Sequence, residues 1–303
     1  MRMAIRYLTT FTYDTAVSES QNALRARPVS DHRQQLREYY VSVDPTVRIT
    51  SHLDYWGTQV DCFGVVGRHT RLTVVADSVV ETLAVDPPVP DAMWPPAVSW
   101  DAPEAEFLAV SPHVEWNDDV ASFGRDVAAG STSTVDAARA VQKAVGELLR
   151  YEAGSTEIGV SVAQIFEQRA GVCQDYAHLA LAVYRSLGVP ARYVSGYLYA
   201  SDASRGDRPD AEEVDVSTHA WVEVLIPGYG WWGLDPTNQL DIGEQHVKIG
   251  HGRDYEDVMP LRGVYHGEAE SGGLSARVKM SRAELDPYAM QPRPEYVRRQ
   301  EQQ

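Results

Sequence analysis

The chain has 303 residues, a hydrophobic fraction of 44% and a formal net charge of -16 at pH 7. This length allows one large domain or two ordinary ones, and the apolar content is enough for a sizeable core. The acidic charge argues against nucleic acid or an anionic membrane surface as a partner. The sequence has only two cysteines, Cys62 and Cys173, and lacks a signal-peptide pattern and a membrane-length apolar run, so we expect a cytoplasmic protein with reduced thiols.

Residues 1–85 have the composition and periodicity of β-strands. Apolar and polar residues alternate in several runs, which are separated by turn signals such as Gly67-Arg68. The runs cover residues 5–13, 36–43, 47–55, 59–66 and 71–83. Several short strands at this spacing predict an N-terminal antiparallel β-sandwich-like domain.

A proline-rich connector follows at residues 86–104. Proline fixes φ and has no backbone N–H to donate, so regular structure is not expected there. We therefore place the domain boundary in this connector. The predicted organisation is listed in chain order: a β-rich domain at 1–85, the linker at 86–104, an α+β core at 105–268, a C-terminal strand at 269–285 and a flexible tail at 286–303.

Helices are predicted within the core, and strands return after them. The helical runs are residues 118–128, 134–149, 161–169 and 173–187, and the strands are residues 192–199, 218–226, 231–235 and 273–280. The turn signals at residues 227–230 predict a hairpin that folds Asp235 back toward His219. The acidic stretch 201–217 leads directly into His219. It is either a mobile rim or lid of the site or an inert linker; we favour the rim, whose acids would suit cationic substrates.

Cys173, His219 and Asp235 are the parts of a thiol nucleophile with its base and orienting acid. Cys173 begins a predicted helix, whose N-terminus offers unpaired N–H groups and a partial positive charge to a thiolate. His219 begins a strand and Asp235 ends one. Cys62 instead fits a buried structural cysteine.

Other polar residues near these positions have plainer interpretations. The histidines at 246, 251 and 266 lie in a segment with weak periodicity, and their spacing matches no zinc pattern. Asp175 is two residues beyond Cys173 on the same helix, so helical geometry turns it away from the thiol. We expect a structural hydrogen-bonding role for Asp175.

Aromatic residues are dense on the predicted strands of the core. For Tyr197, Trp221 and Trp232 two roles are open. They either pack in the core or together form a wall that keeps water from a thioester, which decides whether an amine or water attacks it.

Taken together, five motifs resemble the bacterial transglutaminase-like superfamily. They are RAGVCQDYAHL at 169–179, GVPARYVSGY at 188–197, HAWVEV at 219–224, WGLDPTN at 232–238 and GRDYEDV at 252–258. The resemblance implies a papain-like α+β fold, in which a Cys-bearing helix packs on an antiparallel sheet, with a triad of Cys173, His219 and Asp235. It also implies that a β-rich N-terminal region precedes this core.

Two features depart from the animal transglutaminases. Those enzymes stabilise the oxyanion with a tryptophan upstream of the cysteine, and this chain has no tryptophan between Trp116 and Cys173. Tyr151 is our hypothesis for the substitute. No calcium-site cluster is evident either, so we expect no cofactor and no metal requirement.

The resemblance and the triad residues together predict cysteine-dependent acyl transfer on a carboxamide, either a glutamine side chain or a peptide amide, through a thioester. Two alternatives stay open: a peptidase or amidase that passes the thioester to water, and a non-catalytic binding module that keeps the fold. The expected partners are a protein, peptide or small amide substrate and an amine acceptor, without nucleic acid or membrane. The oligomeric state is not predicted.

Overall fold

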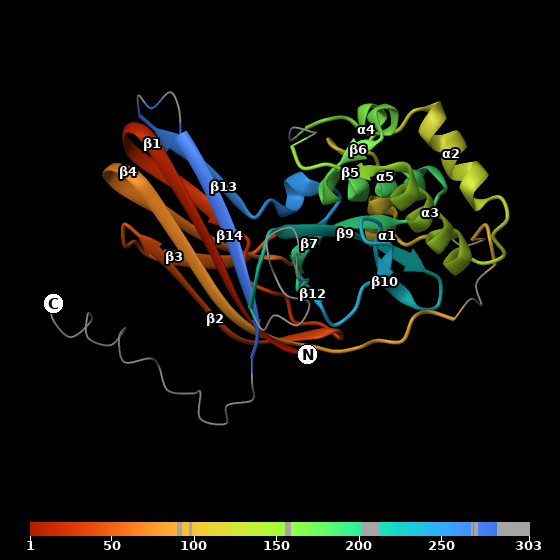
Figure 1. Ribbon diagram of the computed structural model, residues 1–303, viewed down its shortest axis with the longest axis horizontal. Coiled ribbons are helices and arrows are strands. Elements are labelled where there is room, and N and C mark those ends of the chain that lie inside the picture. The colour runs from red at the N-terminus through yellow and green to blue at the C-terminus, as the bar shows by residue number, and fades with distance from the viewer. Residues whose placement is uncertain are drawn as a thin grey trace.

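The computed structural model describes residues 1–89, 93–96, 99–154, 159–200, 213–267, 269 and 272–283. The predicted tail at 286–303 and residues 201–212 of the acidic stretch lie outside these ranges. Figure 1 shows the N-terminal sheet on one side, the helices on the other and a second sheet between them. The architecture is mixed α+β, as predicted. In the described part of the chain, no helix has the length and apolar character needed to cross a bilayer.

The N-terminal strands form an antiparallel sheet, which confirms the β-rich character of this region. They are β1 (Arg2–Leu24), β2 (Gln34–Asp44), β3 (Ile49–Leu53) and β4 (Gln59–Thr82). Strands β1 and β4 pair along most of their length, so their partners join one connected seven-stranded sheet.

The predicted turn at Gly67-Arg68 is wrong. Strand β4 runs through this point, with Gly67 at φ 118°, and the irregularity shows as register shifts opposite residues 12–19 of β1. A glycine in this conformation bends a strand without ending it.

Later segments of the chain complete the N-terminal sheet. The predicted strand at 273–280 is β14 (Gly272–Arg282), which pairs with β1. Strand β13 (Leu261–His266) also pairs with β1, and β8 (Glu213–Val216) pairs with β14. Only Ser217 separates β8 from the strand of His219, so the N-terminal sheet is joined covalently to the start of that strand.

The second sheet is antiparallel and has the order β11-β10-β9-β7-β12. Its strands are β7 (Ala191–Leu198), β9 (Thr218–Ile226), β10 (Gly230–Asp235), β11 (Leu240–Asp241) and β12 (His246–Gly252). The predicted hairpin is present, with Gly230 opposite Ile226 and Leu234 opposite Val222. This register carries Asp235 back to the end of β9 that holds His219.

Four helices lie where the sequence predicts them. They are α2 (Asp118–Ala128), α3 (Thr134–Leu148), α4 (Val162–Gln168) and α5 (Cys173–Ser186). The side chains of Asn117, Ser133 and Ser161 accept hydrogen bonds from first-turn N–H groups, and these caps fix where α2, α3 and α4 begin. The proline-rich connector also contains a short helix, α1 (Ala102–Ala105), which is followed by the turn η1 (Glu106–Leu108).

Two apolar cores hold the second sheet in place. On one face α5 is almost wholly buried against β7 and β9, with α2, α3 and α4 around it. The other core lies between the N-terminal sheet and the β7–β12 edge, where Tyr197, Val247 and Ile249 pack against apolar residues of β1 and β4. The second sheet is therefore fixed from both sides, which suits a site built on its strands.

Candidate active site

Cys173 is the first residue of α5, as predicted, and is partly buried. The short strand β6 (Ala170–Gly171) leads into it, and the backbone N–H of Val172 donates to Asp175 Oδ2 over 2.7 Å. A Cβ on Gly171 would lie 2.6 Å from that oxygen, so only glycine fits here. Asp175 thus has the structural hydrogen bond expected for it, and the chain enters the helix with the thiol at its N-terminus.

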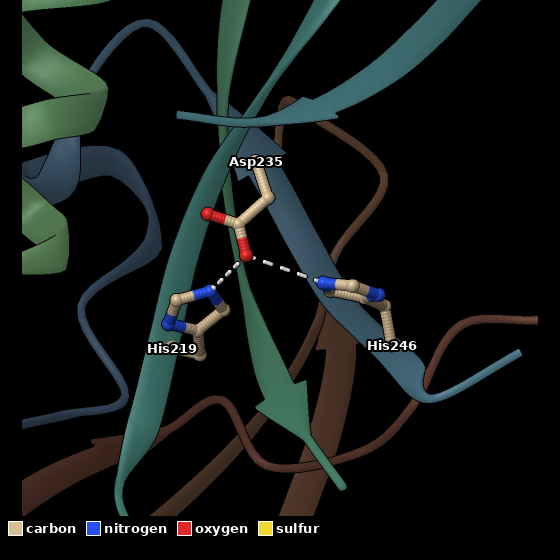
Figure 2. A group of neighbouring side chains, drawn as sticks. All are labelled: His219, Asp235 and His246. Carbon is tan, nitrogen blue, oxygen red and sulfur yellow. Dashed lines mark hydrogen bonds and ion pairs between the residues drawn. The ribbon is translucent and has the colours of Figure 1, made fainter. Parts of the chain in front are cut away.

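His219 and Asp235 meet at neighbouring strand ends. His219 is the second residue of β9 and Asp235 is the last of β10, and His219 Nε2 lies 2.7 Å from Asp235 Oδ2 (Figure 2). Cys173 also interacts with the imidazole, because together with Asp235 it raises the pKa of His219. Because Nε2 faces Asp235, Nδ1 is the ring nitrogen left for Cys173. The structure therefore brings together the three residues proposed from the sequence.

Asp235 is fully buried and surrounded by donors. Its Oδ1 accepts the backbone N–H groups of Thr237 at 2.9 Å and Asn238 at 3.1 Å, and its Oδ2 also accepts Asn238 Nδ2 at 2.7 Å. Burial works against ionisation, but hydrogen bonds from His219, His246 and Asn238 outweigh it and hold the pKa of Asp235 far below its usual range. Asp235 is therefore a fixed carboxylate.

The environment of His219 favours the imidazolium. Burial lowers the pKa of this side chain, but hydrogen bonds and charge interactions with Asp235 and Cys173 prevail and raise the pKa from 6.5 to about 10. A protonated imidazole beside a cysteine at a helix N-terminus is the arrangement that stabilises a thiolate. It can also supply a proton to a leaving amine.

His246 is the site residue that sequence reasoning missed. It opens β12 and is buried, and its Nε2 lies 3.3 Å from Asp235 Oδ2. The alternation of His246 and Lys248 with Val247 and Ile249 could have indicated a strand. Its contact with Asp235 depends on the packing of β12 beside β7, which no local pattern reveals.

The ring nitrogens and carboxylate oxygens of His219, Asp235 and His246 lie within 4.8 Å of one another, close enough to hold a metal ion. Their hydrogen bonds argue against that use. Gly243 N–H donates to His246 Nδ1 at 3.3 Å, which leaves the proton on Nε2, where it points at Asp235. A metal ion would have to displace the two ring N–H groups, of His246 and of His219, that face Asp235 Oδ2. The expectation of metal independence stays a prediction.

The structure places the tentative site residues in different surroundings. Tyr151 lies in β5 (Arg150–Tyr151), is 58% exposed and pairs in parallel with Gly171, two residues before Cys173. Tyr197, Trp221 and Trp232 are 1–2% exposed, which leaves them little surface for contact with a substrate. The oxyanion and wall roles stay predictions.

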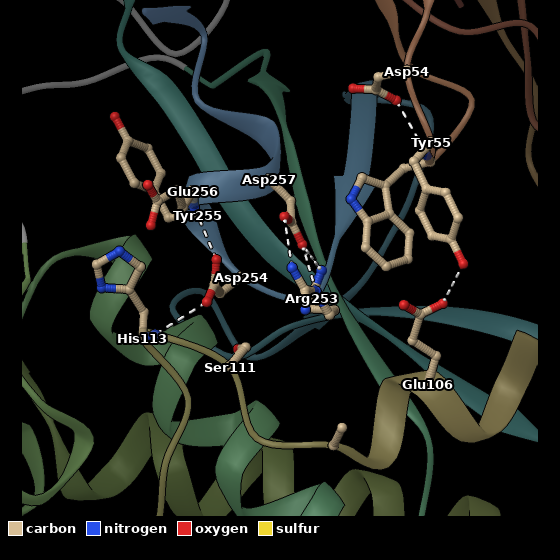
Figure 3. A network of polar contacts seen from close by, with 12 residues as sticks. Asp54, Tyr55, Glu106, Ser111, His113, Arg253, Asp254, Tyr255, Glu256 and Asp257 are labelled. Atoms are coloured by element: carbon tan, nitrogen blue, oxygen red, sulfur yellow. Dashed lines mark hydrogen bonds and ion pairs between the residues drawn. The ribbon is translucent and has the colours of Figure 1, made fainter.

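The GRDYEDV run takes part in a second polar network (Figure 3). Arg253 donates to Asp257 at 3.0 Å, Asp254 accepts the backbone N–H of His113 at 3.0 Å, and the N–H of Tyr255 donates to His178 on α5 at 3.3 Å. A cavity of about 480 Å³ lies between this run and the β3–β4 turn at residues 54–56, and no triad residue lines it. Arg253 stacks over Trp56 of that turn at 5.5 Å, so the run contacts both α5 and the N-terminal region.

A buried ion cluster lies farther along β9. Glu223 accepts Lys248 Nζ at 2.7 Å and Arg192 Nε at 2.6 Å, and Arg192 stacks over Trp231 at 4.2 Å. Burial opposes ionisation of Glu223, but the two cations outweigh it and push its pKa well below the usual range. The cluster links three neighbouring strands of the second sheet, β9, β7 and β12.

A helix that presents cysteine to an antiparallel sheet carrying histidine and aspartate defines a papain-like cysteine site. Comparison with known families agrees: residues 121–236 match the transglutaminase-like superfamily core and residues 3–81 match the bacterial transglutaminase-like N-terminal region. The chain belongs to the transglutaminase-like superfamily.

Two of the similar proteins match most of the chain, and a third matches a quarter of it. An uncharacterized protein of Mycobacterium leprae is 37% identical over 268 residues, covering 88% of this chain and 94% of that protein. The solved structure of a proposed cysteine protease from Cytophaga hutchinsonii has a TM-score of 0.73 at 22% identity, covering 94% of this chain and 91% of the other. A protein-glutamine gamma-glutamyltransferase of Pseudomonas aeruginosa is 38% identical over 76 residues, 25% of this chain and 11% of that enzyme.

Proposed function

We propose that the protein is a cysteine-dependent acyltransferase that acts on carboxamides. The observation that carries the proposal is the buried array in which Asp235 holds His219 beside Cys173, with the pKa of His219 raised to about 10. A protonated His219 in this position can stabilise a thiolate at Cys173 and can later give its proton to the leaving amine.

The reaction proceeds in two halves. Cys173 Sγ attacks the carbonyl carbon of a glutamine side chain or peptide amide and forms a tetrahedral oxyanion. The backbone N–H of Cys173 at the helix N-terminus is one candidate donor to this oxyanion, and Tyr151 is another. The C–N bond then breaks as His219 gives its proton to the leaving ammonia or amine, and a thioester remains. In the second half His219 takes a proton from the incoming amine, which displaces the thiolate.

The acceptor distinguishes a transferase from a hydrolase. The 76-residue match with the Pseudomonas glutamyltransferase supports transfer to an amine. With water in place of the amine, the same thioester gives a peptidase or amidase. We also propose that the substrate is a protein, a peptide or a small amide. The proposed location of the protein is the cytoplasm.

The test is incubation with a glutamine-containing protein and a fluorescent primary amine, with Cys173→Ser as the matched control. Covalent incorporation of the amine that the control lacks supports the proposal. Cysteine-dependent release of carboxylate without incorporation assigns a hydrolase instead. Absence of both products, together with ordinary thiol reactivity of Cys173, would point to a binding module that keeps the fold.

A further inference from the structure

We propose that His246 is a positioning residue of the active site, which holds Asp235 where that carboxylate can accept a hydrogen bond from His219. This inference rests on the proposed function, because it assigns His246 a part in activating Cys173. Figure 2 shows the arrangement: His219 and His246 approach the same oxygen of Asp235 from opposite sides.

The hydrogen bonds of His246 determine its tautomer. Its Nδ1 accepts the backbone N–H of Gly243 at 3.3 Å, so the proton is on Nε2, which lies 3.3 Å from Asp235 Oδ2. A neutral imidazole in this state donates one hydrogen bond to the carboxylate. Carboxylates that orient a catalytic group are commonly held by further donors of this kind.

The surroundings of His246 keep it neutral. Burial lowers the pKa of His246, and the positive charges of His219 and Arg33 oppose its protonation as well, although Asp235 favours it. The rings of Trp221 and His246 form a T-shaped pair, with centroids 5.4 Å apart at an interplanar angle of 74°. The ring therefore has a fixed orientation, and as a neutral group it does not compete with the charge of His219.

The N-terminal sheet and the loop between β1 and β2 fix the segment that carries His246. The Arg33 guanidinium donates to the carbonyl of Ile242, and Thr82 Oγ1 donates to the carbonyl of Glu244 at 2.6 Å. From the second sheet, the N–H of Tyr199 donates to the carbonyl of Gln245 at 2.9 Å. Residues 242–246 are thus anchored just before β12. The β-rich region accordingly supports Asp235 through His246.

Two substitutions separate the two hydrogen bonds of the imidazole. His246→Gln places an amide N–H near the former Nε2 and keeps a donor to Asp235, whereas His246→Asn reaches only the former Nδ1 position and keeps a partner for Gly243. Each is made in a Cys62→Ser background, in which Cys173 is the one thiol of the chain. The readouts are the rate constant of iodoacetamide alkylation at pH 6 and the unfolding temperature.

We expect His246→Asn to slow alkylation about tenfold, the effect of losing one hydrogen bond to a charged group, and His246→Gln to stay within about threefold of wild type. Equal losses in both variants that follow their unfolding temperatures would overturn the proposal. So would faster alkylation in His246→Asn, because removing a neutral donor exposes His219 to more of the charge of Asp235. Slow alkylation already in the parent protein would instead reject the proposed function itself.

Discussion

Replacement of Asp235 by asparagine removes the negative charge that stabilises the His219 imidazolium and keeps the shape of the side chain. Without that charge, burial lowers the pKa of His219 and only the interactions with Cys173 still raise it, so the value falls from about 10 toward 6.5. At about 1.4 kcal/mol for each pH unit, loss of the whole shift is roughly 5 kcal/mol in stabilisation of the imidazolium, which is the upper limit of the effect. A charge pair at 2.7 Å with His219 only 11% exposed is consistent with an effect of this order.

The assay is an NMR titration of histidine-labelled protein, in which His219→Asn identifies the His219 signal among those of the nine histidines. Cys173→Ser is the control: it keeps Asp235, so His219 should still titrate well above 6.5.

The raised pKa of His219 also makes the folding stability depend on pH. The folded pKa of His219 lies above the unfolded value of 6.5, so its contribution to the unfolding free energy is full below pH 6.5 and is lost as pH rises toward about 10. Asp235→Asn should abolish that loss. A variant in which His219 still titrates near 10 would refute this reasoning.

Three further predictions concern the supports of the site. Gly171→Ala places a methyl group 2.6 Å from Asp175 Oδ2, so the unfolding free energy from urea denaturation should fall by about 1–3 kcal/mol, and an unchanged value would contradict the tight fit. Glu223→Gln leaves two buried cations without their counter-charge and should cost about 3–5 kcal/mol by the same measurement; a loss below about 1 kcal/mol would show that the cluster is not a charge-balanced unit. Tyr151→Phe should slow acylation about tenfold or more if the hydroxyl stabilises the oxyanion, and an unchanged acylation rate would remove Tyr151 from that role.

Local pattern was enough to predict most of the core. The helix that begins at Cys173 follows from an apolar face at helical spacing, and the hairpin after Ile226 follows from its turn residues. The hairpin also indicated that Asp235 returns toward His219, but the strand register that brings the two into contact came only with the structure. The match of these segments to the superfamily motifs then indicated which sheet and helix must pack together.

What could not be predicted depends on contacts distant in the sequence. Strand β13 is mostly exposed and lacks a clear apolar alternation, and it is a strand because β1 offers a free edge. The site also extends to His246, whose ring contacts Asp235 only after β12 pairs with β7. Likewise, Gly67 reads as a turn signal but lies within a strand, since a paired neighbour overrides the local preference.

The central claim is that Cys173 and His219 form a thiolate–imidazolium pair. The most direct test is the rate of Cys173 alkylation against pH in the Cys62→Ser background, with and without His219→Ala. Such a pair should give fast alkylation that persists at pH values where an ordinary thiol, with a pKa of about 8.5, is protonated, and a large loss of that rate in His219→Ala. Slow alkylation that rises only at alkaline pH and does not depend on His219 would contradict the claim.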